Sequence, residues 1–295
     1  LVNNFISANP NIRALIADHW KSLELIKTEY FKKIETFCLL HSKEINHEVG
    51  SSLNKRLIKS TNNADYIIAN SNFTKELAIK VGIDKSKINI IFPGIQKPKD
   101  IENILKVKAE KIFGDSFPKI ITVSRLDKRK SHDKILMLIK NLKPKFPKIK
   151  YVSIGFGKEE DNLLKLTKGL GVEKEVTFLK NIDYNLKIAL IAQANLFLMP
   201  SRIEKKSVEG FGISFIEAAS CGVGSIGGKD GGASDAIVHN KTGLICDGSD
   251  LNSIYDSVVS FFRNENFIKF GKNAQEFSKK FHWDKVVKNY LKLIN

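Results

Sequence analysis

The sequence predicts an α/β protein with two domains, each built on a parallel β-sheet. Short apolar runs alternate with segments of helical period along all 295 residues. This alternation is typical of parallel sheets covered by helices on both faces. The length suffices for two separate cores, and a polar connector with turn-forming residues divides the chain.

The candidate strands fall into two groups on either side of this connector. Four precede it, at Ile12–Ile16, Thr36–Leu40, Tyr66–Ala69 and Ile88–Phe92. Six follow it, at Lys119–Val123, Tyr151–Ile154, Val176–Leu179, Leu196–Met199, Val223–Ile226 and Gly243–Cys246. Six strands are enough for a complete doubly wound sheet, whereas four correspond to part of a second domain.

Helix candidates lie between the strands. They are Leu53–Thr61, Thr74–Val81, Ser131–Leu142, Asn162–Lys168, Asn185–Gln193, Gly212–Ser220 and Leu251–Arg263. Phe92-Pro93-Gly94 ends a strand with turn chemistry, and Lys97-Pro98-Lys99-Asp100 forms the connector. We therefore expect a first domain at 1–97, a second at 98–272, and terminal helices at 273–295 that pack back toward the first domain.

The net charge of +16 comes mainly from lysine, since arginine occurs only at positions 13, 56, 125, 129, 202 and 263. Two interpretations of this charge remain open: solvated helix faces, or attraction to an anionic membrane surface or a phosphorylated substrate. A nucleic-acid-binding protein would show clustered arginines with interleaved aromatic residues, and the sequence has no such cluster.

Cysteines and apolar runs bear on where the protein functions. Cys38, Cys221 and Cys246 are widely spaced and form no Cys-x-x-Cys pair, which favours three reduced thiols in a cytoplasmic protein. No apolar run approaches the roughly 20 residues that span a bilayer. Trp20, Lys21 and lysines of the early helices suggest peripheral contact with lipid headgroups on the inner face of the membrane.

The stretch with the most candidate ligand-binding residues runs from Glu209 to Glu217. A strand ends at Pro200, a loop follows, and a helix begins near Gly212, so the stretch covers the end of that loop and the start of the helix. Gly210 and Gly212 carry no side chains, so a ligand can approach the backbone closely. The amide groups at the helix start, around Ile213 and Ser214, favour an anion, and a pyrophosphate is the obvious candidate.

Two acidic residues bracket this predicted anion site. The carboxylate of Glu217, about one turn into the helix, can accept hydrogen bonds from a ribose diol. Glu209, before the helix, lies where a sugar hydroxyl would be. The spacing therefore fits a sugar–diphosphate–ribose ligand. The alternative interpretation is an acidic residue that only stabilises the helix dipole.

Cations are needed to neutralise a diphosphate leaving group. Arg125 follows the strand Lys119–Val123, and Lys130 comes five residues later. Ligands bind at the strand ends of open parallel sheets, so both residues are candidates to hold the diphosphate as negative charge develops. No Asp-x-Asp sequence occurs, so we expect no metal bridging the diphosphate and no other cofactor.

At this point the sequence resembles glycosyltransferase family four, the retaining enzymes with the GT-B fold. Glu209-Gly210-Phe211-Gly212 with Glu217 is similar to the Glu-x7-Glu motif of that family. Further similarities, in the same order along the chain, are His41-Ser42-Lys43-Glu44, Ser124-Arg125-Leu126 with Lys130, Gly155-Phe156-Gly157, Met199-Pro200-Ser201-Arg202, Gly231-Gly232-Ala233 and Lys241-Thr242-Gly243-Leu244. The resemblance runs from about His41 to Trp283 and is closest to phosphatidylinositol mannosyltransferase-like enzymes.

The resemblance implies a hexosyltransferase in which two Rossmann-like domains face a cleft. Glu209, Arg125, Lys130 and His41 would be its catalytic residues. Its donor-binding residues would be Gly210, Phe211, Gly212, Ile213, Ser214, Glu217, Gly155 and Gly157. The donor would be a GDP- or UDP-sugar, with GDP-mannose favoured, and the acceptor a lipid or an oligosaccharide. The leaving phosphate itself would assist the acceptor, so no protein nucleophile is required.

The chain also departs from the family pattern. Ser42 follows His41 where the family has glycine, which would narrow the site. The first strands of the family and their glycine-rich loop have no counterpart, so we expect an N-terminally truncated acceptor domain, and donor binding without turnover by this chain stays open. Two alternatives therefore stay open: a non-catalytic sugar-nucleotide-binding fragment and, with less support, a basic nucleic-acid-binding protein.

Overall fold

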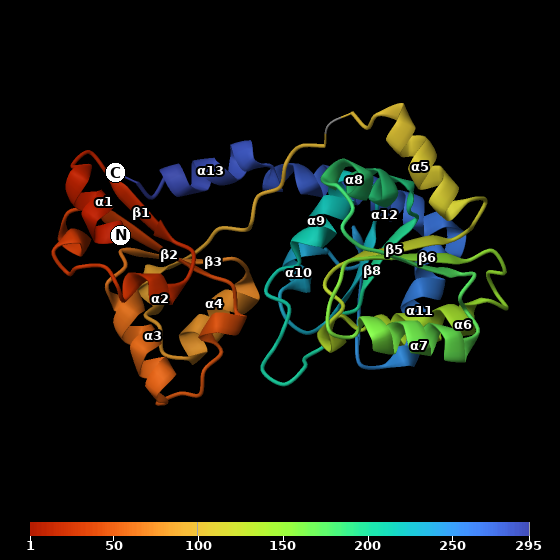
Figure 1. Ribbon diagram of the computed structural model, residues 1–295, viewed down its shortest axis with the longest axis horizontal. Helices are drawn as coiled ribbons and strands as arrows, with labels where there is room; N and C mark the ends of the chain where they lie inside the picture. Colours follow the sequence, from red (N-terminus) through yellow and green to blue (C-terminus); the bar gives the residue numbers. More distant parts are fainter. Residues whose placement is uncertain (99, 295) are drawn as a thin grey trace. The chain divides into compact units, whose positions relative to one another are not determined.

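The computed structural model describes residues 1–98 and 100–294, and the chain divides into two compact units (Figure 1). The first unit joins Leu1–Gly94 to the segment that starts at Trp283, and the second is Ile95–His282. Each unit is built on a sheet whose strand pairs are all parallel. This confirms the predicted fold class. Lys99, in the predicted connector, lies outside the described residues.

The sheet of the first unit has four strands in the order β1-β2-β3-β4. Its strands are β1 (Ala14–Ala17), β2 (Glu35–Leu40), β3 (Tyr66–Ala69) and β4 (Ile88–Ile90). Its helices are α1 (Val2–Ala8), α2 (Trp20–Leu23), α3 (Ser52–Asn62), α4 (Asn72–Lys80) and α13 (Trp283–Leu291). Ser51 and Ser71 accept hydrogen bonds from Asn54 N and Thr74 N and so fix the starts of α3 and α4.

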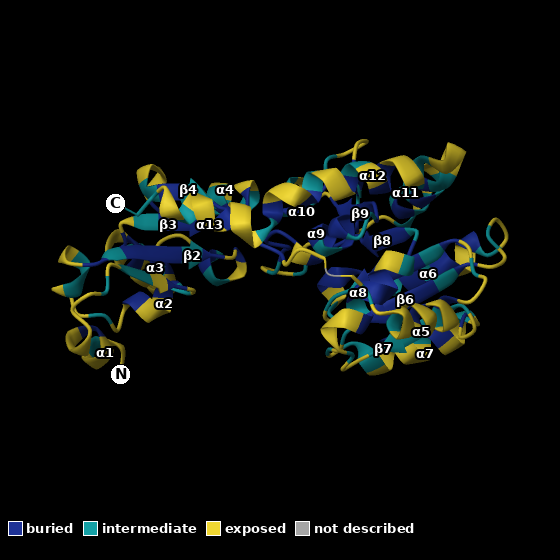
Figure 2. Cartoon of the chain, turned by 90° about the horizontal axis from the view of Figure 1, so that it is seen from above, coloured by how far each residue is buried: buried dark blue, intermediate teal, exposed yellow. Residues whose placement is uncertain are grey.

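Helices cover both faces of this first sheet (Figure 1). On one face, side chains of α2, α3 and α4 form a core with Cys38 and Leu40. On the other face, Val286 of α13 packs on Phe37 and Ile68. Strand β2 is therefore buried on both sides, which agrees with its dark blue colour in Figure 2 and its apolar sequence.

The sheet of the second unit has six strands in the order β10-β9-β8-β5-β6-β7. Its strands are β5 (Lys119–Val123), β6 (Lys150–Ile154), β7 (Val176–Leu179), β8 (Leu196–Met199), β9 (Ser225–Gly228) and β10 (Gly243–Cys246). Read from β7 to β10, this is the 3-2-1-4-5-6 order of a doubly wound fold. The order reverses between the neighbouring strands β5 and β8.

Helices cover both faces of the second sheet as well. They are α5 (Asn103–Phe113), α6 (His132–Leu142), α7 (Glu160–Leu170), α8 (Tyr184–Gln193), α9 (Ile213–Ser220), α10 (Ala233–Ala236), α11 (Leu251–Phe262) and α12 (Asn266–Ser278). In Figure 1, α8, α9 and α12 lie on one side of the strands, and α6, α7 and α11 lie on the other. Every residue of the central strand β8 is buried.

The structure differs from the sequence prediction at β9, which we expected at Val223–Ile226 and which spans Ser225–Gly228. Gly222 has φ +77°, so a turn follows α9 and the strand begins two residues later than predicted. Gly227 and Gly228 then occupy strand positions, although glycine seldom favours strands. Gly228 is required because a Cβ there would lie 1.8 Å from the carbonyl oxygen of Ser201.

The borders of the two units also differ from the predicted positions. We placed them at 97/98 and 272/273, whereas the compact units change at Gly94/Ile95 and at His282/Trp283. Residues 273–282 therefore belong to the second unit. The amide of Ile95 donates to the carbonyl of Phe281 at 2.8 Å, which places both ends of the second unit side by side.

Candidate functional site

The sheet of the second unit places two loops where its strand order reverses. The loop 124–131 follows β5, and the loop 200–212 follows the neighbouring strand β8. In open parallel sheets this reversal opens a crevice at the carboxyl ends of the strands, and ligands bind there. Six of the twelve site residues predicted from the sequence belong to these two loops, namely Arg125, Lys130, Glu209, Gly210, Phe211 and Gly212.

Helix α9 begins at the end of the second loop. Gly212 has φ +84°, and a Cβ there would lie 2.6 Å from the ring of Phe215, so only glycine fits without strain. Among the described residues, no side chain caps this helix start. The amides of Ile213 and Ser214 in the first turn are therefore donors suited to an anion.

Glu209 lies in a buried cluster with two cations. Its Oε2 atom accepts hydrogen bonds from Nη1 of Arg129 at 2.9 Å and from Nζ of Lys130. The hydroxyl of Ser201 is 3.5 Å from the same oxygen. All three charged side chains are buried, and only about a tenth of each is exposed. The structure thus brings together two of the predicted site residues, Glu209 and Lys130.

The charges in this cluster control its protonation. Burial by itself would raise the pKa of Glu209, but Lys130 and Arg129 outweigh burial and hold that pKa below its ordinary value. Burial lowers the pKa of Lys130 in spite of the opposing charge of Glu209. An additional anion next to Lys130 would favour its charged form.

Arg125 occupies a different environment from the buried cluster. Its side chain is 62% exposed and forms an ion pair with Asp127 at 2.9 Å. The arginine that contacts Glu209 is Arg129, which the sequence analysis did not select. Its position beside Lys130 and the scarcity of arginine in the chain were the signals that could have identified it.

Gly155 and Gly157 position the loop that carries Arg125. A Cβ on Gly155 would lie 1.9 Å from the carbonyl oxygen of Ser124, and one on Gly157 would lie 2.5 Å from that of Leu126. The amide of Leu126 donates to the carbonyl of Phe156 at 3.0 Å. The two glycines therefore let the loop after β6 pack directly on the loop after β5.

Glycines also bring a third loop, the one between β9 and α10, against Glu209. The amide of Gly232 donates to the carbonyl of Glu209 at 2.8 Å. A Cβ on Gly232 would lie 2.0 Å from the carbonyl oxygen of Gly210. Phe211, next in the chain, is buried and its ring centroid lies 5.7 Å from that of Phe281. The backbone around Glu209 is thus held from two sides.

Glu217 lies on α9, as predicted, and pairs with a residue that the sequence analysis missed. Nζ of Lys187 on α8 is 2.7 Å from Oε1 of Glu217. The same ammonium group lies 4.5 Å from the centre of the Tyr184 ring. The hydrogen bond between Glu217 and a ribose diol stays a prediction.

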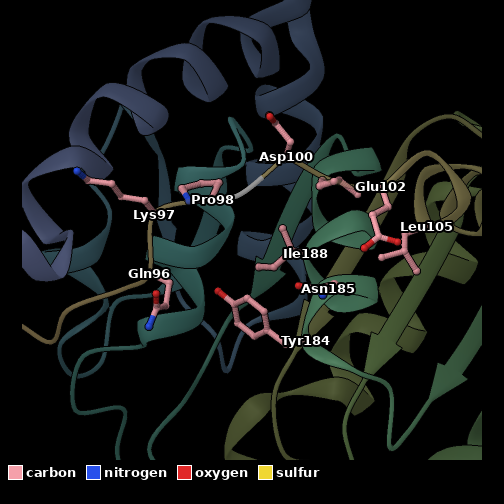
Figure 3. Close-up of a pocket in the computed structure, with 10 residues that line it drawn as sticks. Gln96, Lys97, Pro98, Asp100, Glu102, Leu105, Tyr184, Asn185 and Ile188 are labelled. Atoms are coloured by element: carbon pink, nitrogen blue, oxygen red, sulfur yellow. The ribbon is translucent and has the colours of Figure 1, made fainter.

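Tyr184 also borders a cavity of about 630 Å³ (Figure 3). The cavity is lined by Gln96, Lys97, Pro98, Asp100, Ile101, Glu102, Leu105, Tyr184, Asn185 and Ile188. These residues come from the connector, α5 and α8. None of the site residues predicted from the sequence lines it.

His41 follows β2 in the first unit. Its Nε2 atom lies 2.9 Å from Oδ1 of Asp18, which follows β1, and its amide donates to Oε1 of Glu44 at 2.5 Å. Ser42 has φ +91°, a conformation that suits the glycine of the family pattern. Asp18 is a second residue that sequence reasoning did not select.

The membrane-contact interpretation of Trp20 is wrong. Trp20 is fully buried, and its Nε1 atom donates to the carbonyl of Glu44 at 2.9 Å. The tryptophan belongs to the core of the first unit. It therefore offers no ring to lipid headgroups.

The comparison with known families agrees with this geometry. The family described as glycosyl transferases, group 1, matches residues 103–280, more than half of the chain. The chain belongs to the group 1 glycosyl transferases. This membership supports the sugar-transfer interpretation over the nucleic-acid-binding alternative.

Two relatives of this chain illustrate the range of its family. The first is the GDP-mannose-dependent α-(1-6)-phosphatidylinositol monomannoside mannosyltransferase of Mycolicibacterium smegmatis. The chain is 28% identical to it over 221 residues, and the alignment covers 72% of this chain and 58% of the relative. The second is the N-acetyl-α-D-glucosaminyl L-malate synthase of Bacillus anthracis, with 27% identity over 262 residues in an alignment that covers 80% of this chain and 66% of the relative. The chain thus spans less than two thirds of either relative.

A solved structure shows the same fold as this glycosyl transferase. HepE from Anabaena, crystallised in complex with UDP, superposes with a TM-score of 0.84 at 18% identity, over 99% of this chain and 81% of that one. The two parallel-sheet units are those of the GT-B fold.

Within residues 1–98 and 100–294, no group of three or more His, Cys, Asp or Glu residues is arranged to hold a metal ion. In the same part of the chain, no helix has the length and apolar character needed to cross a bilayer.

Proposed function

We propose that this chain transfers a hexosyl group from a nucleoside diphosphate sugar, with retention of anomeric configuration, at the crevice between the loops after β5 and β8. The observation that carries the proposal is the buried cluster of Glu209, Arg129 and Lys130 in these loops. In this cluster, a carboxylate that can bind a sugar contacts two cations that can bind phosphate.

The donor would extend along α9. The amides of Ile213 and Ser214 and the ammonium of Lys130 would hold the diphosphate, and Arg125 would approach it from the loop after β5. As the sugar–phosphate bond breaks, negative charge grows on the diphosphate, and these preorganised groups would stabilise it. Gly210, Gly212, Gly155 and Gly157 would keep the backbone close enough for these contacts.

The two acids would hold the sugar and the ribose. The ionised Glu209 would accept hydrogen bonds from hydroxyl groups of the transferred sugar. Glu217, steadied by Lys187, would accept a hydrogen bond from the ribose diol. The role of His41 in transfer rests on the family resemblance alone, and we assign Phe211 to the packing of the loop that presents Glu209.

We propose GDP-mannose as the donor and a lipid or glycan as the acceptor. The relative from Mycolicibacterium smegmatis, whose name specifies GDP-mannose and a phosphatidylinositol mannoside, supports both choices. UDP in the HepE structure supports UDP-sugars as the competing donors. Calorimetric titration with GDP-mannose, UDP-glucose, GDP and UDP distinguishes them. Tighter binding of the UDP compounds would overturn the choice of mannose.

The transfer reaction is tested with labelled donor and a lipid or oligosaccharide acceptor mixture. Lys130→Met and Glu209→Gln should each reduce transfer at least a hundredfold, since they remove charges from the reacting end of the donor. Lys128→Met changes an exposed lysine two residues away and should leave the rate within twofold.

The proposal fails if all three variants behave alike, or if the wild-type chain binds none of the four nucleotides. Donor binding without transfer to any acceptor would instead support the sugar-nucleotide-binding alternative. Thermal unfolding of each variant checks that a loss of rate is not a loss of folding.

A further inference from the structure

Arg129 is the most deeply buried arginine next to the proposed donor site. It lies in the short 3₁₀ turn Lys128–Lys130 after β5, and the residue is 8% exposed. Its Nη1 atom donates to Oε2 of Glu209 at 2.9 Å. Lys130 donates to the same oxygen, so both cations are anchored on one carboxylate.

The Nε–H group of Arg129 has no such partner. It is buried, and it finds no acceptor within residues 1–98 and 100–294. The guanidinium group is planar and rigid, so while Nη1 contacts Glu209 the Nε–H group points along the other edge of the group, away from Nη1. A buried charged donor without an acceptor costs free energy, and such groups occur where a ligand supplies the acceptor.

The charge of the cluster indicates which ligand fits. Arg129 and Lys130 supply two positive charges, and Glu209 supplies one negative charge, which leaves a net positive cluster. Phosphate oxygens, like carboxylates, are strong charge-assisted acceptors for a guanidinium group, and a diphosphate is the anion that the proposed donor carries. Arg125 differs because its side chain is mostly exposed and already pairs with Asp127.

We propose that Arg129 binds the sugar-side phosphate of the donor through Nε while Nη1 remains on Glu209. This inference rests on the proposed function and adds to it a residue outside the Arg125–Lys130 pair that sequence resemblance identifies. One side chain then connects the phosphate that leaves with the acid that holds the sugar. Binding the diphosphate would thereby fix the orientation of Glu209.

The test compares Arg129→Lys and Arg129→Gln with the wild-type chain by calorimetry. Lysine keeps the charge but loses the planar fork, and glutamine keeps a planar N–H donor without the charge. Each nucleoside diphosphate is titrated beside its monophosphate: GDP with GMP, and UDP with UMP. Only the diphosphates carry the phosphate that Arg129 would hold.

We expect both variants to bind the preferred diphosphate at least tenfold more weakly and the matching monophosphate within twofold of wild type. Equal losses for diphosphate and monophosphate, or no loss for either, would overturn the role of Arg129. The matching Arg202→Lys variant on the next loop should not show the diphosphate-specific loss, because Arg202 pairs with Asp133. A wild-type chain that binds the diphosphate but transfers no sugar would contradict the proposed function and leave this inference standing.

Discussion

Arg202 and Asp133 form an ion pair with two contacts, Nη1 to Oδ1 at 3.0 Å and Nη2 to Oδ2 at 3.1 Å. Asp133 lies in the first turn of α6, and the amide of Arg202 donates to the carbonyl of Arg129 at 2.9 Å. The pair therefore ties the loop after β8 to the loop that carries Arg129 and Lys130.

Loosening this pair should weaken the binding of both kinds of nucleotide. Arg202→Lys retains the charge but loses one contact, so we expect affinity for nucleoside monophosphates and diphosphates to fall by the same factor, about threefold. Arg56→Lys is the matched control, since Arg56 makes a two-contact pair with Glu24 in the first unit. Calorimetry on both variants checks the prediction, and an equal effect of the two would contradict it.

Replacing Ser42 by glycine should stabilise the first unit. Ser42 has φ +91° and ψ −58°, a strained backbone for any residue with a side chain, and its buried hydroxyl has no partner within the described residues. We expect Ser42→Gly to raise the free energy of unfolding by about 1 kcal/mol.

Ser51→Gly provides the comparison for this change. Ser51 has φ −65° and caps α3 through its side chain, so the same substitution there should be neutral or slightly destabilising. Thermal unfolding of both variants measures the difference. A stability loss in Ser42→Gly would show that the serine conformation carries no strain.

The stability of the second unit should depend on pH through His132. Burial, opposed by a backbone hydrogen bond at Arg125, lowers the pKa of His132 to about 4 from an ordinary value of 6.5. The ring contacts Ser124 Oγ and Tyr151 OH at 3.0 Å each. The positive charge of Lys130 lowers this pKa further, whereas the carboxylates of Asp133 and Asp127 raise it.

The direction of the pH dependence of stability follows from this lowered pKa of His132. The unfolded chain binds a proton at His132 below pH 6.5 and the folded chain only near pH 4, so acid favours unfolding. His132 should contribute full stability above pH 6.5 and lose about 3 kcal/mol as the pH falls to 4. Urea unfolding from pH 7.5 to 4 should show a flatter pH profile for His132→Gln. Identical profiles would rule this contribution out.

Adding a single methyl group at Gly155 should disturb the donor site. Gly155 has φ +147°, and a Cβ there would lie 1.9 Å from the backbone oxygen of Ser124. We expect Gly155→Ala to cost about 1–3 kcal/mol of stability and to weaken nucleotide binding, because the loop that carries Arg125 must move.

Gly169→Ala is the control for this prediction. Gly169 lies inside α7, and an added Cβ would meet no described atom within 4 Å beyond its chain neighbours and its own helix backbone, so alanine should stabilise the helix by about 0.5–1 kcal/mol. Calorimetry and thermal unfolding of the two variants give the comparison. If Gly155→Ala bound nucleotide as tightly as wild type, the positioning role of this glycine would be wrong.

Much of the fold could be predicted because strand and helix periods are local properties. Lys119–Val123, Leu196–Met199 and Gly243–Cys246 are apolar runs flanked by polar turns, and the structure has strands at these positions. The strand at Val223–Ile226 was misplaced because glycines that pack against a neighbouring carbonyl lower strand propensity. The pairing of β5 with β8 depends on tertiary packing, which no local period encodes.

The site was harder to predict at the level of individual side chains. Glu209 and Lys130 follow neighbouring strands, so their proximity could be inferred from strand ends alone. Which arginine is buried depends on the 3₁₀ turn Lys128–Lys130 and on Ser131, whose φ of +58° is not apparent from residue type. Trp20 was misjudged for a similar reason, since a tryptophan beside a lysine suits both a membrane interface and a core.

The placement of α13 determines when each unit can finish folding during synthesis. Residues 95–282 form one uninterrupted stretch, whereas the first unit needs Val286, from the last helix, to cover Phe37 and Ile68. A ribosome therefore releases every part of the second unit before the apolar face of the first sheet can be closed. Premature termination after His282 would leave that face open to solvent while residues 95–282 are already complete.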